Sequence, residues 1–187
     1  TNYSESLFVE YYYGKEAGAA YVRGTRKNIQ NDKPIIGQYD VNNEGSGDMY
    51  YKGGNMLHTI RQIINNDDKW RQILRGLNST FYHQTVTTKQ IEDYISEHAS
   101  IDLTSVFNQY LRDTRVPTLE YYFKEKQLVY RWINCVDGFS MPLQVDLNGE
   151  FLRIQPTNEW KVQTLATTNS KLTIDANYYV AGLNSSN

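Results

Sequence analysis

Apolar residues repeat every three to four positions through roughly the first 110 residues, and this spacing places them on one face of successive helices. Short polar turns separate the segments, as in antiparallel helices that pack side by side. Two helices are predicted within residues 1–32, on either side of Gly14, and a third over residues 49–64. The fourth has its apolar face from Trp70 to Phe81. The fifth begins at a capping box of Thr87 and Gln90, and the sixth is capped by Asp102.

From Pro117 onward, apolar positions alternate with polar ones, which is the two-residue period of a strand. Asn148-Gly149 is a hairpin signal because both residues tolerate positive φ. The predicted strands lie near residues 119–123, 128–132, 143–147, 151–154, 160–165, 172–174 and 178–180, and a loose tail follows over 184–187. Short strands at this spacing favour an antiparallel β-sandwich. The predicted fold class is therefore α plus β in two parts, with an all-α helical domain over residues 1–115 and a β-sandwich domain over residues 116–187.

The loop over residues 33–47 meets the next helix at Asp48-Met49-Tyr50-Tyr51-Lys52-Gly53-Gly54. The first turn of a helix has free backbone N–H groups and a partly positive end, which favours oxyanion-like groups nearby. Two glycines in that turn weaken the helix by roughly 1 kcal/mol each relative to Ala. We therefore expect a close approach to the backbone at this turn. The Asn- and Gly-rich part of the loop, residues 36–47, is expected to be mobile.

Tyr50-Tyr51-Lys52-Gly53-Gly54, at the start of an apolar helix, resembles the Tyr-x-Lys-Gly segment of the aminopeptidase N and leukotriene hydrolase family of zinc metallopeptidases, the gluzincins. Residues 1–7 are similar to the helix that follows the third zinc ligand of that family. Residues 116–119 resemble the Gly-x-Pro-x-Leu join between its helical region and its β-domain. The resemblance implies that residues 1–115 form the helical C-terminal part of a thermolysin-like catalytic domain.

The resemblance also implies roles for individual residues. Tyr50 occupies the position of the catalytic tyrosine, whose protonated phenol would donate a hydrogen bond to the oxyanion of a tetrahedral intermediate. Local sequence alone favours a packing tyrosine at this position, and the resemblance reverses that preference. Glu5 lies where a carboxylate of the family orients a metal ligand, or it is an exposed helix glutamate. Lys52 either holds the loop, which we favour, or is solvated. Cys135 has no motif around it and is expected to fill apolar space.

The zinc ligands themselves are missing from the sequence. Its three histidines, His58, His83 and His98, lack the i, i+4 spacing that brings two imidazoles to one metal, and they are expected at surface or half-buried positions. We therefore expect a C-terminal fragment whose zinc ligands precede Thr1, with no leader peptide and with neither bound zinc nor peptidase activity on its own. The parent would be a zinc aminopeptidase that removes N-terminal residues from peptides. The alternative is a non-catalytic scaffold or protein-binding module that keeps the architecture.

Composition narrows the choice of partners. A net charge of −2 and a pI of about 5.9 give no electrostatic reason to expect nucleic acid as a partner. No stretch approaches the ~20 apolar residues of a membrane span. The single cysteine excludes an intrachain disulfide and leaves the compartment open, with a periplasmic or secreted location favoured over the cytoplasm. If a partner surface has been removed, apolar side chains within residues 3–21 should be exposed, or covered by a second copy in a homo-oligomer.

Overall fold

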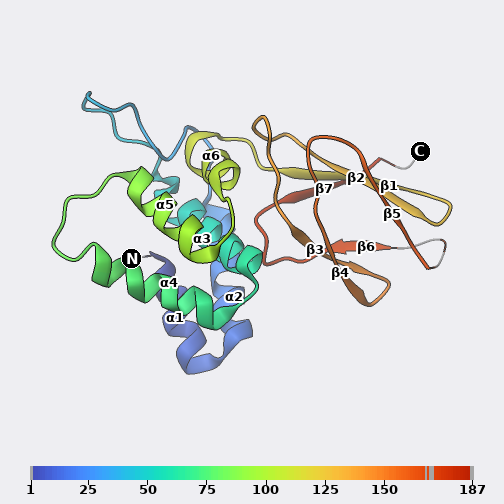
Figure 1. The fold of residues 1–187 in the computed structure, drawn as a ribbon, viewed down its shortest axis with the longest axis horizontal. Helices are drawn as coiled ribbons and strands as arrows, with labels where there is room; N and C mark the ends of the chain where they lie inside the picture. Colours follow the sequence, from blue (N-terminus) through green and yellow to red (C-terminus); the bar gives the residue numbers. More distant parts are fainter. Residues whose placement is uncertain (1, 167, 169–170, 186–187) are drawn as a thin grey trace.

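The computed structural model describes residues 2–166, 168 and 171–185, and its helices occupy one end of the molecule and its strands the other (Figure 1). The α-helices are α1 (Asn2–Tyr13), α2 (Lys15–Gly24), α3 (Tyr51–Ile64), α4 (Asp67–Thr80), α5 (Thr88–Ala99) and α6 (Thr104–Arg112), with 3-10 turns η1 (Thr25–Asn28) and η2 (Gly47–Met49). The strands are β1 (Thr118–Lys124), β2 (Gln127–Ile133), β3 (Leu143–Leu147), β4 (Glu150–Ile154), β5 (Lys161–Thr164), β6 (Leu172–Ile174) and β7 (Ala181–Asn184). The predicted α plus β composition is confirmed.

Local sequence signals fix several helix ends. Gly14 has φ of +93°, a conformation that glycine adopts without strain, and it separates α1 from α2. The Asn66 side chain accepts a hydrogen bond from the backbone N–H of Lys69 and caps α4. Thr87 and Gln90 form the predicted capping box of α5. The caps of α4 and α5 each join residues three positions apart, so both partners lie within one short stretch of sequence.

The strands form two sheets, with the orders β5-β2-β1-β7 and β4-β3-β6. Pairing is antiparallel in both sheets except between β1 and β7, which run parallel, with Thr118 opposite Ala181 and Tyr121 opposite Asn184. The prediction of a wholly antiparallel arrangement was therefore wrong at this edge. The tail is also less loose than predicted, since Asn184 belongs to β7 and the N–H of Ser185 donates to the carbonyl of Tyr121 at 2.8 Å. The remaining tail residues, 186–187, lie outside the described residues.

The chain between β6 and β7 returns to the helices instead of forming the strand predicted at 178–180. The backbone N–H of Tyr179 donates to Thr59 Oγ1 on α3 at 3.0 Å, and the Tyr178 hydroxyl donates to the carbonyl of Gln62 at 3.3 Å. The Tyr110 hydroxyl of α6 donates to the carbonyl of Tyr179 at 2.7 Å. These backbone groups are satisfied by the helices, so they are not available for a strand ladder. The strand therefore begins only at Ala181.

One continuous apolar core runs through both parts. Buried side chains of α3, α4 and α6 belong to the same cluster as those of the two sheets, which include Leu119 and Trp132. The change from helix to strand falls between Arg112 and Thr118. No helix in the described ranges is long and apolar enough to cross a membrane.

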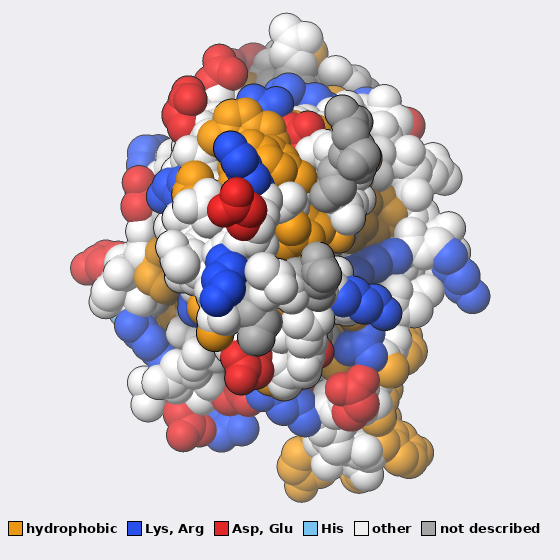
Figure 2. Space-filling view, turned by 90° about the vertical axis from the view of Figure 1, so that its right-hand side faces the viewer, with side chains coloured by type: hydrophobic (Ala, Val, Ile, Leu, Met, Phe, Trp, Pro, Cys, Tyr) orange, Lys and Arg blue, Asp and Glu red, His pale blue; other side chains and the backbone are white. Residues whose placement is uncertain are grey.

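The surface is mixed in charge. Figure 2 shows the end formed by the sheets, where hydrophobic side chains gather in one area and charged side chains of both signs surround them. On the helical part, several aromatic side chains of α1 and α2 are exposed, as predicted for residues 3–21: Phe8, Tyr11, Tyr12, Tyr13 and Tyr21. Whether a second copy covers them stays a prediction.

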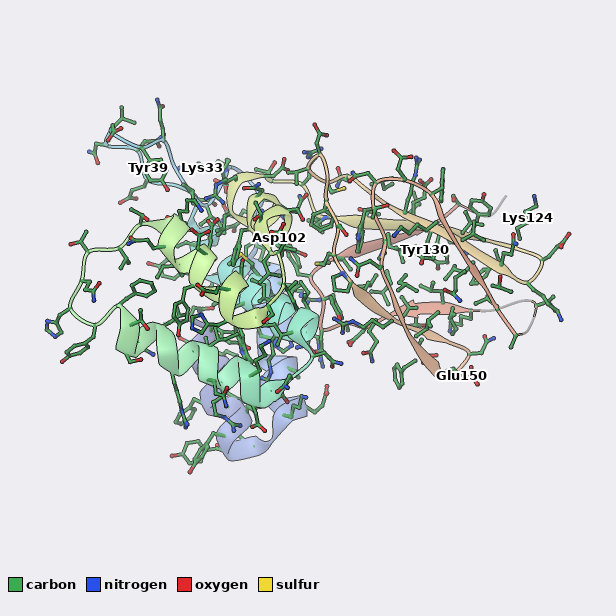
Figure 3. The ribbon with its side chains drawn as sticks, in the orientation of Figure 1. Lys33, Tyr39, Asp102, Lys124, Tyr130 and Glu150 are labelled. Carbon is green, nitrogen blue, oxygen red and sulfur yellow. The ribbon has the colours of Figure 1, made fainter. Side chains whose placement is uncertain are left out.

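The long loop before η2 extends away from the helices, and Figure 3 labels Lys33 and Tyr39 on it. Its two ends are held, because the N–H of Ile36 donates to the carbonyl of Leu111 at 3.1 Å and the N–H of Ser46 donates to the carbonyl of Pro34 at 2.9 Å. Mobility of the loop between these ends stays a prediction.

Candidate functional site

The start of α3 is fixed by a short polar turn. The Ser46 side chain accepts a hydrogen bond from the N–H of Asp48 at 3.1 Å and caps η2. The Ser46 hydroxyl donates in turn to the carboxylate of Asp32, and this bond lowers the pKa of Asp32. Ser46 is only 1% exposed, so this cap is shielded from water. The turn that delivers the chain to Tyr50 is therefore held by buried hydrogen bonds.

Asp48 anchors the same turn to the segment that follows η1. Its side chain is 2% exposed, and its two oxygens accept hydrogen bonds from the backbone N–H groups of Gln30 at 2.9 Å and Asn31 at 2.7 Å. A carboxylate that receives two backbone N–H donors is held in one orientation. The sequence did not single out Asp48 for this role, because its partners lie 17 and 18 positions away.

Tyr50 lies between η2 and α3 and presents its ring outward. Its N–H donates to the carbonyl of Gly47 at 3.2 Å, and its carbonyl accepts from the N–H of Gly54 at 3.0 Å, so its backbone is fixed on both sides. Its side chain is 56% exposed. Within the described residues, no hydrogen bond engages its hydroxyl group. Tyr50 is therefore not a core-packing tyrosine, and its phenol is free to donate to another molecule.

Lys52 is buried, and the alternative that it is solvated was wrong. Its side chain is 0% exposed, and its ammonium group donates to the carbonyl of Asp113, just beyond α6, at 2.8 Å. Burial lowers the pKa of Lys52, and the neighbouring carboxylates of Asp48, Asp113 and Asp32 oppose that shift. Lys52 therefore ties the first turn of α3 to the end of α6, a structural role.

The two glycines after Lys52 differ in their surroundings. A Cβ atom on Gly54 would lie 3.1 Å from Asn2 Oδ1, so the start of α1 packs closely against α3 there. A Cβ atom on Gly53 would meet nothing closer than the carbonyl of Asp48 at 4.0 Å. The expected close approach therefore explains Gly54, whereas nothing in the described structure requires a glycine at position 53.

Glu5 is exposed on α1 and accepts a hydrogen bond from the Tyr21 hydroxyl at 2.7 Å. This bond is the main reason that the pKa of Tyr21 is raised, with smaller contributions from burial and from the charges of Glu5 and Tyr51. Tyr51 thus lies near the Glu5–Tyr21 pair. No hydrogen bond or ion pair joins Glu5 to Tyr50 within the described part of the chain.

The histidines do not form a metal site. His58 is buried rather than half-buried or superficial; its Nε2 atom lies 3.2 Å from Asn177 Oδ1, and burial lowers its pKa to about 4. His98 stacks on Tyr94 at a ring-centroid distance of 3.8 Å, and His83 is exposed. In residues 2–166, 168 and 171–185, no group of three or more His, Cys, Asp or Glu side chains is placed to hold a metal ion.

Cys135 is buried, as expected for a residue that fills space. Its sulfur accepts a hydrogen bond from the Asn158 side chain at 3.3 Å, and burial raises the pKa of its thiol. A raised pKa disfavours the nucleophilic thiolate.

Comparison with known proteins gives a likeness in fold only. No family model matches the sequence, and no curated protein sequence matches it. Among solved structures, the chain is similar to aminopeptidase A from Legionella pneumophila, which was determined in complex with aspartic acid. The TM-score is 0.66 at 10% sequence identity, over 97% of this chain. The chain spans 23% of the length of that aminopeptidase, so its fold corresponds to one part of the larger structure.

Proposed function

We propose that this chain is the tyrosine-bearing part of a zinc-dependent aminopeptidase of the gluzincin type, in which Tyr50 stabilises the transition state of peptide hydrolysis. The observation that carries the proposal is the exposed Tyr50 side chain on a firmly held helix start. The likeness in fold to part of an aminopeptidase supports it. In this proposal the helices belong to the catalytic domain, and the two sheets pack as the β-sandwich that follows it.

Hydrolysis of a peptide passes through a tetrahedral intermediate with a negatively charged oxygen. A donor that is already oriented stabilises this oxygen without reorganisation during the reaction. The anchors at Ser46, Asp48 and Lys52 fix the backbone on both sides of Tyr50 and would provide that orientation. The partly positive end of α3 favours the same developing charge.

The described residues do not by themselves fit a zinc ion. The three histidines are dispersed, and Glu5 has no second ligand beside it. The proposal therefore requires that the metal ligands come from outside residues 1–187. Peptides are the proposed substrates.

The test is Tyr50→Phe in a natural polypeptide that contains residues 1–187 together with its metal site. The variant removes only the hydroxyl. If the hydroxyl stabilises the oxyanion, kcat for an aminoacyl anilide should fall by roughly 10²–10³, while KM changes little. The thermal midpoint should stay within about 1 °C of wild type, because the hydroxyl has no partner that would be left unsatisfied.

Tyr51→Phe is the matched control, since it removes a hydroxyl from the neighbouring residue of the same turn. It should retain most of the activity. Loss of turnover in Tyr51→Phe alone would move the catalytic role by one residue. Normal turnover in both variants would show that this turn has no catalytic role and would favour the non-catalytic scaffold or protein-binding module.

A further inference from the structure

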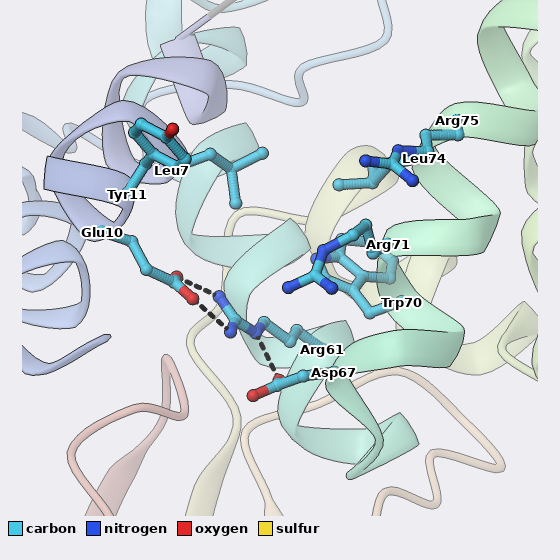
Figure 4. A pocket seen from close by; sticks show the side chains of 9 residues that line it. All are labelled: Leu7, Glu10, Tyr11, Arg61, Asp67, Trp70, Arg71, Leu74 and Arg75. Atoms are coloured by element: carbon cyan, nitrogen blue, oxygen red, sulfur yellow. Dashed lines mark hydrogen bonds and ion pairs between the residues drawn. The ribbon is translucent and has the colours of Figure 1, made fainter. Parts of the chain in front are cut away.

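A pocket of about 250 Å³ lies between α1 and α4, and Tyr50 is not among the residues that line it (Figure 4). Its lining combines apolar side chains with several charged ones: Leu7, Glu10, Tyr11, Arg61, Asp67, Trp70, Arg71, Leu74 and Arg75. The volume exceeds the cavity of about 150 Å³ that holds a benzene ring in another protein. An aromatic side chain therefore fits.

The acidic groups of this pocket are already neutralised. Arg61, whose side chain is 6% exposed, donates from both terminal nitrogens to the two oxygens of Glu10 and from Nε to Asp67 at 2.8 Å. The second oxygen of Asp67 accepts from Lys15 at 2.7 Å. Two cations and two carboxylates thus form one network of ion pairs. Each of the four carboxylate oxygens thus accepts a hydrogen bond from one of these two cations.

Arg71 and Arg75 add positive charge that is not balanced within the pocket. They lie four residues apart on α4 and therefore on one face of that helix. In Figure 4 both guanidinium groups extend toward the space between α4 and α1. Arg71 forms an ion pair with Asp68 at 3.1 Å, and the side chains of Arg71 and Asp68 are largely exposed. Arg75 has no hydrogen bond or ion pair with any described residue.

The rest of the pocket is apolar. Leu7 comes from α1, and Trp70 and Leu74 come from α4. Trp70 is only 2% exposed, and its indole N–H donates to the Tyr3 hydroxyl at 3.3 Å, so the apolar surface open to an occupant comes mainly from the half-buried Leu7 and Leu74 beside it. An occupant therefore gains from placing an apolar group against these side chains.

We infer that this pocket binds an apolar side chain together with the carboxylate next to it. Two guanidinium groups on one helix face suit a carboxylate, because arginine pairs with that planar group through parallel hydrogen bonds. The apolar wall suits an aromatic or aliphatic side chain, which in an amino acid begins two bonds away from the carboxylate carbon. This chemistry is shared by N-acylated aromatic amino acids and by the carboxyl-terminal residue of a peptide. The inference does not depend on the proposed catalytic role of Tyr50.

The first experiment titrates the 187-residue chain with N-acetylphenylalanine and, separately, with N-acetylphenylalaninamide, by calorimetry at low salt. The acid should bind saturably with a dissociation constant of about 1 mM or lower, as its size allows. The amide has the same ring but no charge and should bind at least about tenfold more weakly. Added salt should weaken the binding of the acid and leave the binding of the amide unchanged. Equal affinities for acid and amide, or no saturation by the acid, would overturn the inference.

The second experiment locates the site. Arg71→Gln and Arg75→Gln should each weaken binding of the acid by roughly tenfold, as expected for loss of a charged hydrogen-bond donor. The change Lys124→Gln, at the exposed last residue of β1, lowers the net charge equally and should leave the affinity unchanged. The Trp70 indole N–H signal in an NMR spectrum should move with ligand in wild type. Equal loss in Lys124→Gln, or a Trp70 signal that stays still while ligand binds, would place the carboxylate elsewhere.

A third titration separates the two sources of the ligand. Acetyl-Ala-Ala-Phe carries the same terminal residue as N-acetylphenylalanine. At least tenfold tighter binding of the tripeptide identifies a peptide carboxyl terminus as the occupant, and equal binding identifies the single residue. Failure of the tripeptide to compete with the bound acid would contradict a shared site.

Discussion

Replacing Arg61 by Met tests the buried ionic cluster that joins α1, α3 and α4. Methionine keeps the apolar stem of the side chain and removes the guanidinium, which leaves Glu10 without its partner at an exposure of 23%. Removal of one partner from a buried pair costs about 3–5 kcal/mol. Because Glu10 is partly reached by solvent and Asp67 keeps Lys15, the lower end applies, and we expect the free energy of unfolding to fall by about 3 kcal/mol.

The assay is urea unfolding followed by far-UV circular dichroism, with Arg71→Met as the control. Among the described residues, Arg71 forms an ion pair with Asp68 alone, and their side chains are 60% and 85% exposed. That control should change stability by less than about 0.5 kcal/mol. A loss below about 0.5 kcal/mol in Arg61→Met as well would show that the Arg61 cluster contributes no more than a surface ion pair.

Acid should reduce the difference in the free energy of unfolding between wild type and Arg61→Met. The hydrogen bond from Arg61 is the main cause that lowers the pKa of Asp67 from 3.8 to about 2. A lowered carboxyl pKa stabilises the fold above pH 3.8, and that contribution is lost as the pH falls toward 2. The full shift would correspond to about 2 kcal/mol, but Asp67 is 40% exposed, so screening reduces it to about 1 kcal/mol. An unfolding difference that stays constant from pH 6 to pH 2.5 would refute this account.

Three further changes test other parts of the fold. Gly45→Ala should lower the free energy of unfolding by about 2 kcal/mol or more and speed proteolysis of the loop, because its Cβ would collide with the carbonyl of Ile35, whereas Gly47→Ala, which meets nothing within 4 Å, should be nearly neutral. His58 is buried with a pKa of about 4 against 6.5 when unfolded, so stability should fall by up to about 3 kcal/mol as the pH drops from 6.5 to 4; an NMR titration that gives a pKa near 6.5 would contradict its burial. Thr87→Ala should cost about 1 kcal/mol in thermal unfolding through loss of the α5 cap, and no loss would show that the cap is replaced by water.

Local signals predicted the helices well because the contacts that end them are local. Asn66, Thr87 and Gln90 bond within three residues, so the sequence itself contains both partners. Strand direction is different. Alternation shows which side chains face inward, but it carries no information on which neighbour a strand meets, and the parallel pairing of β7 with β1 was therefore missed.

The candidate site was only partly predictable for the same reason. The Tyr-x-Lys-Gly pattern identified Tyr50 and Lys52 as a unit, and the preference for a structural Lys52 proved right. The anchor supplied by Asp48 could not be found, because a lone aspartate before a helix usually reads as a cap. Its actual partners, the N–H groups of Gln30 and Asn31, become neighbours only after α1, α2 and the loop have packed.

The return of the chain to α3 after β6 has a consequence for how this protein folds during its synthesis. The N–H of Tyr179 meets the hydroxyl of Thr59 across 120 positions, and the Tyr178 hydroxyl meets Gln62 across 116. The helices emerge from the ribosome first, yet buried α3 lacks these contacts until residue 179 has been translated. At about 5–20 residues per second, α3 waits roughly 6–24 s for its final partners. During that interval the surface of α3 around Thr59 and Gln62 is open to other nascent chains and to chaperones, so slow translation of the strand region would prolong the exposure of that surface.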